Sequence, residues 1–431
     1  MKIGMLVDTY LPILGGAEIH VLELSRALRQ QGFEIAICTA VPPPPPPSPC
    51  LADRQAMAEN GGGEKYFSTA GGKAARSTEK VLPLFPGEGG AGGMGEEFPI
   101  LRLPRLLGGG WRAVLGILPA LPRLIAFIRD VDFVHCHYSF LMAALGTLLC
   151  RLLGKPSAVT LHGLGTLDSS VDKSPLHRLY RFIALKLAGT IIATSEEMRA
   201  VALRFSPADR VVVIPNGVNT HAFTPSPKPE STSPELVILT MRRLAPKNGV
   251  QYLVEAAPEV VAALPQVRFW VAGEGKLESA LRKQVKEEKL EEYFCFLGIV
   301  PHEQTPEYYH QADIVVFPSS AESTSLACLE AMCCEKAIIA SNLSAYKDML
   351  GTSGERGALV PLFDREESDY NAPLTLPPER IHALAQAIIS LAGDAKLRTR
   401  LGKAARRFAV ERYDWSLIAT QTVHIYQKER A

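Results

Sequence analysis

The feature that most constrains the fold is an alternation of short β-branched runs with stretches of helical periodicity along the chain. Between the first two runs, Ile19, Leu22 and Leu28 recur at helical spacing. Strands that alternate with helices form parallel sheets covered on both faces. The predicted strands are residues 3–7, 34–39, 133–136, 158–161, 190–193, 211–214, 236–240, 268–272, 294–297, 314–317 and 337–340. Because the pattern runs twice, we predict an α/β protein with two doubly wound domains.

A segment rich in Pro, Ser and Thr, FTPSPKPESTSPE, separates the two halves and is typical of a linker. At 431 residues the chain is long enough for two domains. We predict a first domain over residues 1–222, a linker over 223–235, a second domain over 236–413 and a terminal helix over 414–431. Two such domains leave a cleft between the carboxyl ends of their sheets, where ligands of these folds usually bind.

Residues 42–97 fit neither sheet. They begin with PPPPPPSP, continue with glycine-rich runs and contain few aliphatic residues. Such a segment cannot bury enough apolar surface to offset its ordering entropy, so we predict a mobile insertion in the first domain. Its G-x-G-x-x-G spacing (Gly87, Gly89, Gly92) follows no strand and opens no helix, which argues against a nucleotide site there.

The charge balance argues against nucleic acid as a partner. The chain has 46 Lys and Arg against 45 Asp and Glu, whereas nucleic-acid binders rely on a basic face. A local basic cleft for a diphosphate remains compatible with this balance. The eight cysteines form no C-x-x-C pair and the N-terminus lacks a basic region before its apolar run, so we expect reduced thiols and a cytoplasmic location.

Two apolar segments bear on membrane contact. Residues 111–128 are interrupted by two arginines and two prolines, and residues 139–150 are shorter than the roughly 20 residues that a spanning helix needs. We expect buried helices and no membrane span. Peripheral contact with an inner membrane surface stays open, because the first segment mixes Arg with Leu and Ile as interfacial helices do.

Glycines and histidines follow strands of the first half. Gly15 and Gly16 precede a helix, where free N–H groups and the helix dipole favour an anion, although a glycine pair is often only a turn. His135, His137 and His162 lie at the carboxyl ends of neighbouring strands. A single histidine at a strand end is usually structural. Several at one sheet edge make a functional role as well supported as a structural one.

The first strand of the second half is followed by RRLAPKNG, which brings Arg242, Arg243 and Lys247 to the carboxyl end of that strand. Cations at this edge would neutralise a diphosphate and stabilise the charge that develops when it leaves. The alternative is a solvated basic turn.

The strongest local signal is the E-x7-E pair formed by Glu322 and Glu330. We predict Glu322 in a loop after a buried strand and Glu330 in the second turn of the next helix. Thr324, Ser325 and Leu326 lie between them at the helix start, where N–H groups are free. One carboxylate beside a diphosphate-sugar and another at a ribose diol would form a coherent donor site.

These motifs together resemble glycosyltransferase family 4, the retaining GT-B enzymes. The matching segments span nearly the whole chain in the family's order: GGAE, HGLG, IPNGVNTHAF, RRLAPKNGV, GEG, LGIVPHEQ and the E-x7-E block. The resemblance implies a GT-B fold, in which two Rossmann-like domains face each other across a cleft. It also implies transfer of a sugar from a nucleotide-diphosphate-sugar, UDP- or GDP-linked, with retention of configuration and without a metal or cofactor.

The resemblance assigns a role to each matching residue. His162 and Glu322 would be the catalytic residues, contacting the transferred sugar near its reacting centre and at its far edge. The residues expected to bind the donor are Gly16, Arg243, Lys247, Thr324, Ser325, Leu326, Glu330, Gly298 and Val300. Among these, Arg243 and Lys247 would hold the diphosphate, Glu330 the ribose, and the segment around Gly298 the base. Glu18 and His137 are candidates for the acceptor side.

The chain departs from the family pattern at three places. Asn248 occupies the position where the family usually has Lys, which leaves the phosphate contact open between Lys247 alone and Lys247 together with Arg242. Residues 323–325 replace the usual aromatic-Gly step, and the insertion lies on the acceptor side. Asp130 and Asp132 spell D-x-D, but they precede a strand and therefore lie on the wrong side of the sheet for a metal-diphosphate site.

Two other functions stay open at this point. A nucleotide-sugar epimerase or hydrolase shares the GT-B architecture, and a non-catalytic nucleotide-sugar-binding scaffold would share the cleft. The acceptor is equally open among glycans, lipid-linked sugars and small molecules. The sequence predicts neither the donor sugar nor the oligomeric state.

Overall fold

The computed structural model describes residues 1–8, 10, 15–40, 97–103, 111–138, 140–163, 175–226, 235–364 and 375–430, with the backbone alone described over 111–118. The predicted mobile insertion and its G-x-G-x-x-G glycines therefore lie outside the described residues, apart from Glu97. That residue pairs with Arg26 and Arg29 of the first helix.

The first domain holds a parallel sheet with the strand order β3-β2-β1-β4-β5-β6-β7. The strands are β1 (Lys2–Val7), β2 (Glu34–Thr39), β3 (Ile100–Arg102), β4 (Phe133–His137), β5 (Ser157–Leu161), β6 (Thr190–Ala193) and β7 (Val211–Val213). The helices are α1 (Gly16–Gln30), α3 (Trp111–Asp130), α4 (Leu141–Leu153), α6 (Pro175–Leu187) and α7 (Glu196–Ala202), with the 3-10 turn η2 (Ala208–Arg210).

The second domain repeats this arrangement with the order β10-β9-β8-β11-β12-β13. Its strands are β8 (Leu236–Met241), β9 (Val267–Ala272), β10 (Phe294–Gly298), β11 (Ile314–Phe317), β12 (Ala337–Ser341) and β13 (Ala358–Val360). The helices are α8 (Val250–Ala263), α9 (Glu278–Glu287), α10 (Thr305–Gln311), α11 (Leu326–Cys333), α12 (Ser344–Leu350), α13 (Pro378–Gly393) and α14 (Ala395–Tyr413). Two 3-10 turns, η3 (Pro246–Asn248) and η4 (His302–Gln304), follow β8 and β10.

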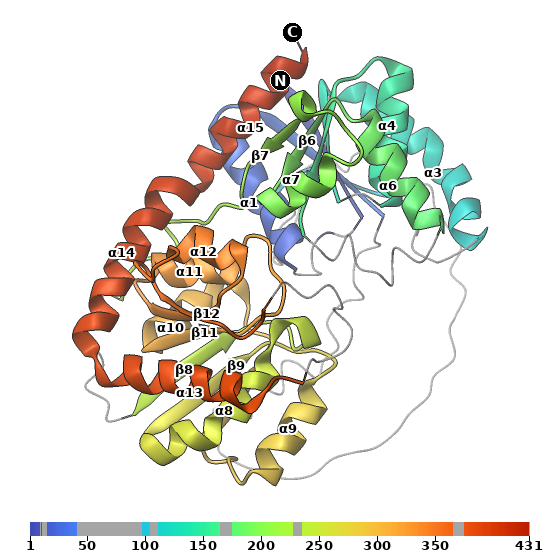
Figure 1. The fold of residues 1–431 in the computed structure, drawn as a ribbon. Helices are drawn as coiled ribbons and strands as arrows, with labels where there is room; N and C mark the ends of the chain where they lie inside the picture. The colour runs from blue at the N-terminus through green and yellow to red at the C-terminus, as the bar shows by residue number, and fades with distance from the viewer. Residues whose placement is uncertain are drawn as a thin grey trace, which may run out of the picture.

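The eleven predicted strands are confirmed to within about one residue at either end, and β3 and β13 were not predicted. Apolar side chains of these strands fill three buried clusters. One includes the packing of α3, α4 and α6 against the first sheet, one lies under α1, and one surrounds the second sheet. The predicted class, two Rossmann-like domains, is therefore confirmed (Figure 1).

The strand order locates the crevice of each domain. In doubly wound sheets the ligand crevice lies outside the carboxyl ends of the strands, where the order reverses. That point falls between β1 and β4 in the first domain and between β8 and β11 in the second. A ligand site is therefore expected in the segments that follow these four strands.

The end of the chain joins the two domains. Helix α14 packs on α11 of the second domain, and α15 (Trp415–Arg430) packs on α1 of the first (Figure 1). The helix breaks at Asp414, whose carboxylate accepts a hydrogen bond from Thr220. Gly217 lies against Trp415, where an added Cβ would come within 2.5 Å of the indole ring. The two segments that cross between the domains therefore lie side by side.

Within the described part of the chain, no helix is long and apolar enough to cross a membrane. The seven cysteines described, at positions 38, 136, 150, 295, 328, 333 and 334, are all free, and only Cys295 is exposed.

Candidate functional site

A buried ion pair lies where the strand order of the second sheet reverses. Arg242 follows β8, Glu322 lies in the loop after β11, and a guanidinium nitrogen of Arg242 contacts the carboxylate. Their side chains are only 8% and 14% exposed. Arg242 also donates hydrogen bonds to Ser325 Oγ at 2.8 Å and to Ser319 Oγ at 2.9 Å. Arg242 thereby connects both loops of the crevice.

Both members of this pair are charged at neutral pH. Burial alone would raise the pKa of Glu322, but the charges of Arg242 and Lys247 hold that pKa below its ordinary value. Burial likewise opposes the charge of Arg242, yet neighbouring groups that include Glu322 keep the pKa of Arg242 above its ordinary value. The pair therefore places a fixed carboxylate in a largely water-excluded crevice.

The two cations assigned to the diphosphate lie around this pair rather than within it. Arg243 is exposed and reaches toward the first domain, since a Cβ added at Gly15 would lie 3.3 Å from its Nη2. Lys247 is close enough to Glu322 to lower its pKa. Asn248, at the family's lysine position, accepts from Arg242 at 3.1 Å and donates to the Arg243 carbonyl at 2.7 Å. This amide therefore holds the loop that carries the cations.

The loop after Glu322 crosses the cleft. Ser323 donates its hydroxyl hydrogen to the His162 carbonyl at 3.2 Å, and Thr324 donates to the Thr194 carbonyl at 2.7 Å. Asn216 of the first domain donates in return to the Thr324 carbonyl at 2.8 Å. The residues at the family's aromatic-Gly step therefore bind the donor-side loop to the first domain.

Helix α11 begins at the end of this loop. Ser325 is its N-cap and accepts from the Cys328 N–H at 3.4 Å. Leu326 packs against the core under α1, and a Cβ added at Gly16 would lie 3.8 Å from Leu326 Cδ1. The N-termini of α1 and α11 thus lie on opposite sides of one narrow space, and both favour an anion there.

Glu330 is buried in the second turn of α11, as predicted from its spacing. Its carboxylate is bonded to His302 Nε2 at 2.8 Å and accepts from the Tyr309 hydroxyl at 3.1 Å. Burial disfavours a charged His302, but Glu330 outweighs burial and raises the pKa of His302 above its ordinary value. Sequence reasoning missed both partners, although His302 lies in the LGIVPHEQ segment.

Gly298 and Val300 lie at the carboxyl edge of β10 beside this group. Gly298 adopts a positive φ of 68°, and its carbonyl accepts from the Gly273 N–H at 2.7 Å. Val300 is partly buried against the second core. They border the crevice some strands away from Arg242, since β10 is at the edge of the sheet and β8 lies two places inward.

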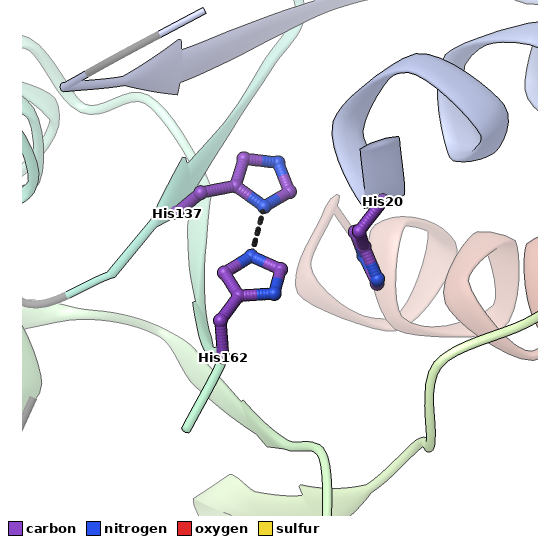
Figure 2. Close-up of side chains that lie close together, drawn as sticks. All are labelled: His20, His137 and His162. Carbon is purple, nitrogen blue, oxygen red and sulfur yellow. Dashed lines mark hydrogen bonds between the residues drawn. The ribbon is translucent and has the colours of Figure 1, made fainter. Parts of the chain in front are cut away.

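Three histidines of the first domain lie close together (Figure 2). His137 Nδ1 and His162 Nε2 are hydrogen-bonded at 2.9 Å, and the ring of His20, from α1, lies edge-on to His162 at 4.6 Å. His20 was not predicted. Its only signal in the sequence is its place one helical turn after Gly16. Burial lowers the pKa of His20 to about 4 and holds the pKa values of His137 and His162 well below the ordinary value.

The other candidates of the first domain fall in two groups. Glu18 is buried in the first turn of α1, with its carboxylate at Gly15, where Arg243 of the second domain also reaches. His135 has one ring nitrogen bonded to the Tyr426 hydroxyl and the other to Thr160 Oγ1, both at 2.7 Å. These bonds give His135 a structural role.

Asp130 and Asp132 lie at the opposite end of the sheet from the cleft. Asp132 accepts from the backbone N–H of Lys2 at 2.8 Å, and Asp130 pairs with the Lys2 ammonium group at 2.8 Å. They precede β4, as the sequence indicated, and form part of no diphosphate site.

Hydrogen bonds link the loops at the switch points of two doubly wound domains, and the second domain holds cations and buried carboxylates there. This combination defines an enzyme of the GT-B class. The family model described as Glycosyltransferase Family 4 matches residues 14–222, and the model described as Glycosyl transferases group 1 matches residues 224–408. The chain belongs to glycosyltransferase family 4 and is a glycosyltransferase.

Similar proteins extend over the whole chain. The phosphatidyl-myo-inositol mannosyltransferase of Mycolicibacterium smegmatis is 27% identical, over 99% of this chain and 94% of its own length. Among solved structures, HepE (Alr3699) of Anabaena in complex with UDP and glucose has a TM-score of 0.71 at 18% identity and covers 99% of this chain and 100% of its own. The sucrose-phosphate synthase of Thermosynechococcus elongatus has a TM-score of 0.69 at 21% identity and covers 99% of this chain and 98% of its own.

Proposed function

We propose that this glycosyltransferase moves a hexose from a nucleotide-diphosphate-sugar onto an acceptor hydroxyl, with retention of configuration and without a metal ion. The observation that carries the proposal is the buried Arg242–Glu322 pair at the switch point of the second domain. It keeps the Glu322 carboxylate charged and oriented, so that Glu322 can accept hydrogen bonds from hydroxyls of the transferred sugar.

The diphosphate lies between the two domains in this proposal. Arg243 and Lys247 flank the ion pair, and the N-termini of α1 and α11 approach each other within the same space. Because Arg242 is already neutralised by Glu322, these other cations and N–H groups stabilise the charge that develops on the leaving phosphate. Protein cations thus do what a divalent metal does in metal-dependent transfer.

Glu330 binds the ribose hydroxyls of the donor. Its two oxygens are held by His302 and Tyr309, which fix the carboxylate at the start of the nucleotide subsite. The edge formed by Gly298 and Val300 lies near the base. The likeness in fold to HepE, whose structure contains UDP and glucose, supports a UDP-sugar, with a GDP-sugar as the alternative donor.

His162 contacts the transferred sugar as a neutral imidazole. Its low pKa means that it acts through hydrogen bonding and shape, and it is not the acceptor's general base in our proposal. The leaving phosphate removes the acceptor proton on the same face of the sugar, which retains the anomeric configuration. Gly16 and Glu18 lie on the acceptor side in this proposal, and His137 is buried behind His162.

The acceptor is presented at an anionic phospholipid surface in this proposal. Four of the exposed large apolar side chains lie on the adjoining helices α4 and α6: Leu148 (37% exposed), Leu152 (71%), Leu179 (50%) and Phe182 (51%). Neither helix contains an acidic residue, and exposed Arg151, Arg178 and Lys186 lie among the apolar side chains. Basic charge interleaved with apolar side chains fits anionic headgroups above acyl chains. The mannosyltransferase relative named for a phosphatidyl-inositol substrate is consistent with this choice.

The test uses one donor with and without a mixture of lipid-linked and soluble acceptors, in the presence of EDTA. We expect nucleotide release that accelerates with acceptor, persists in EDTA and gives a product whose anomeric proton coupling matches that of the donor. Inversion, or loss of transfer in EDTA, would contradict the mechanism. Turnover indifferent to acceptor would favour the epimerase or hydrolase, and binding without release would favour the scaffold.

A further inference from the structure

We propose that His20, His137 and His162 form a binding site for one transition-metal ion of the Zn²⁺ type. The three imidazoles come from α1, from the end of β4 and from the residue after β5, and they lie close together (Figure 2). One ring nitrogen of each lies within 4.8 Å of a nitrogen of both others. The site shares His162 with the proposed transfer reaction, which itself uses no metal in our proposal.

Each ring of this cluster keeps one nitrogen without a partner. His20 Nε2, His137 Nε2 and His162 Nδ1 are buried and have no hydrogen-bond partner among the described residues. A buried polar atom left unpaired costs about 1–3 kcal/mol. Such an atom in a native structure requires an explanation, and an ion is one of the few available. In His137 and His162 the bonded nitrogens, Nδ1 and Nε2, face each other, so the unpaired atom that a metal would engage is His20 Nε2.

The hydrogen bonds around His20 fix its tautomer for metal binding. Asn216 donates through Nδ2 to the Thr324 carbonyl at 2.8 Å, so the oxygen of this amide is the atom that faces His20. That oxygen is 2.9 Å from His20 Nδ1, which must therefore carry the proton. His20 Nε2 is left with a bare lone pair. A ligating histidine whose other nitrogen donates to an oxygen is the usual arrangement in metal sites.

The geometry between His137 and His162 is already near that of two ligands. Their bonded nitrogens are 2.9 Å apart, whereas two nitrogens about 2.0–2.1 Å from a tetrahedral Zn²⁺ are about 3.3 Å apart. A metal can take the place of the shared proton after small ring rotations. That proton moves to the other nitrogen of its own ring, which has no partner, so both rings remain neutral.

The donor set selects the kind of metal. The cluster offers imidazole nitrogens and no carboxylate, which suits Zn²⁺, Co²⁺, Ni²⁺ or Cu²⁺ and disfavours Mg²⁺ and Ca²⁺. Three protein ligands leave a fourth position for water.

One consequence rests on the proposed function. His162 cannot both bind the metal and meet the transferred sugar. Occupancy of the site would therefore inhibit transfer, and a chelator would relieve the inhibition. Metal binding itself does not depend on the identity of the donor.

The test is direct metal binding by the full chain after removal of metals with a chelator. We expect one Zn²⁺ per chain in equilibrium dialysis, and tetrahedral absorption bands in the visible spectrum when Co²⁺ is added. His20→Gln and His137→Gln should each weaken binding by more than about 100-fold, because losing even an outer partner of a ligand costs about 10- to 100-fold. His135→Gln is the matched control and should change affinity less than twofold, since both nitrogens of His135 already have partners.

The outcomes separate this proposal from the proposed function. No stoichiometric binding by the wild type, or equal binding by a folded His20→Gln variant, would overturn the metal site whatever the enzyme does. If His137→Gln fails to fold by circular dichroism, the second variant is Asn216→Ser, which keeps all three imidazoles. It removes the acceptor of the His20 Nδ1 proton and should weaken Zn²⁺ binding about tenfold. Dialysis contains no donor, so metal binding in the absence of any transfer would leave the site standing and remove only its inhibitory consequence.

Discussion

The hydroxyl of Thr324, in the second domain, donates a hydrogen bond to the carbonyl oxygen of Thr194, in the first, at 2.7 Å. The bond ties the loop after Glu322 to the end of β6, and it is buried. The loop after Glu322 therefore takes its position from both domains.

Removing this hydroxyl should weaken catalysis more than stability. Thr324→Val leaves the Thr194 carbonyl unpaired, which costs about 1–3 kcal/mol. The value of kcat/KM should therefore fall by about tenfold or more. Thr324→Ser retains the hydroxyl and is the control, with a change below about threefold. Steady-state kinetics with the preferred donor checks this, and equal losses in both variants would argue against the bond.

The Arg242–Glu322 pair should be sensitive to the loss of one partner and tolerant of the loss of both. Glu322→Leu leaves a buried guanidinium uncompensated and should destabilise the protein by about 3–5 kcal/mol. The double variant Arg242→Met/Glu322→Leu should recover most of that stability without recovering activity. Urea unfolding of the wild type, of Glu322→Leu, of Arg242→Met and of the double variant measures the coupling, and additive losses would contradict a buried, charged pair.

The His302–Glu330 pair should make stability depend on pH. Because folding raises the pKa of His302, its contribution is complete below the unfolded pKa of about 6.5. That contribution is lost as pH rises through the higher folded pKa. The free energy of unfolding of the wild type should therefore fall from pH 6 upward relative to His302→Gln. If the free energies of unfolding of the two proteins changed in parallel with pH, protonation of His302 would not be coupled to folding.

Gly249 should tolerate no side chain. It has a φ of 73°, and an added Cβ would lie 1.8 Å from the Pro318 carbonyl oxygen. Gly249→Ala should lower Tm by several degrees and weaken donor binding, because the loop with Lys247 would shift away from the end of β11. Gly393→Ala, where an added Cβ meets nothing within 4 Å, is the control and should leave Tm unchanged or raise it. Calorimetry compares the two.

The apolar surface of α4 and α6 should govern membrane association. Leu152→Glu/Phe182→Glu should reduce cosedimentation with vesicles containing anionic phospholipid by at least about tenfold, because it removes apolar contacts and adds negative charge. Activity on a soluble donor in the absence of acceptor should not change. Leu417→Glu, exposed on α15, is the control. Vesicle binding that survives the double change would place the contact elsewhere.

The alternation of strands and helices made the fold predictable, but two strands escaped. Ile100–Arg102 and Ala358–Val360 are three residues long and largely half-buried, so neither shows a period that differs from a loop. They form pairs because β2 and β12 present open edges to them. Tertiary pairing, rather than local sequence, creates such strands.

Within the site, the residue types could be predicted from the sequence, but which residue is buried and which is exposed could not. Arg242 and Arg243 are adjacent, and alternation along an extended segment turns one inward and the other outward. The sequence does not reveal which is which until the register of the loop is known. His20 resembled any residue of an amphipathic helix, and only the packing of α1 over the ends of β4 and β5 brings it to His137 and His162.

In the proposed function, the enzyme cleaves a nucleotide-sugar and requires the Glu322 carboxylate to do so. The most direct measurement is nucleotide release from UDP-, GDP- and ADP-sugars by the wild type, by Glu322→Gln and by the exposed control Glu287→Gln. Release from one donor by the wild type and the control, reduced by at least about 100-fold in a folded Glu322→Gln protein, is the predicted result. Release from no donor, or release that Glu322→Gln leaves unchanged, would contradict the proposed site.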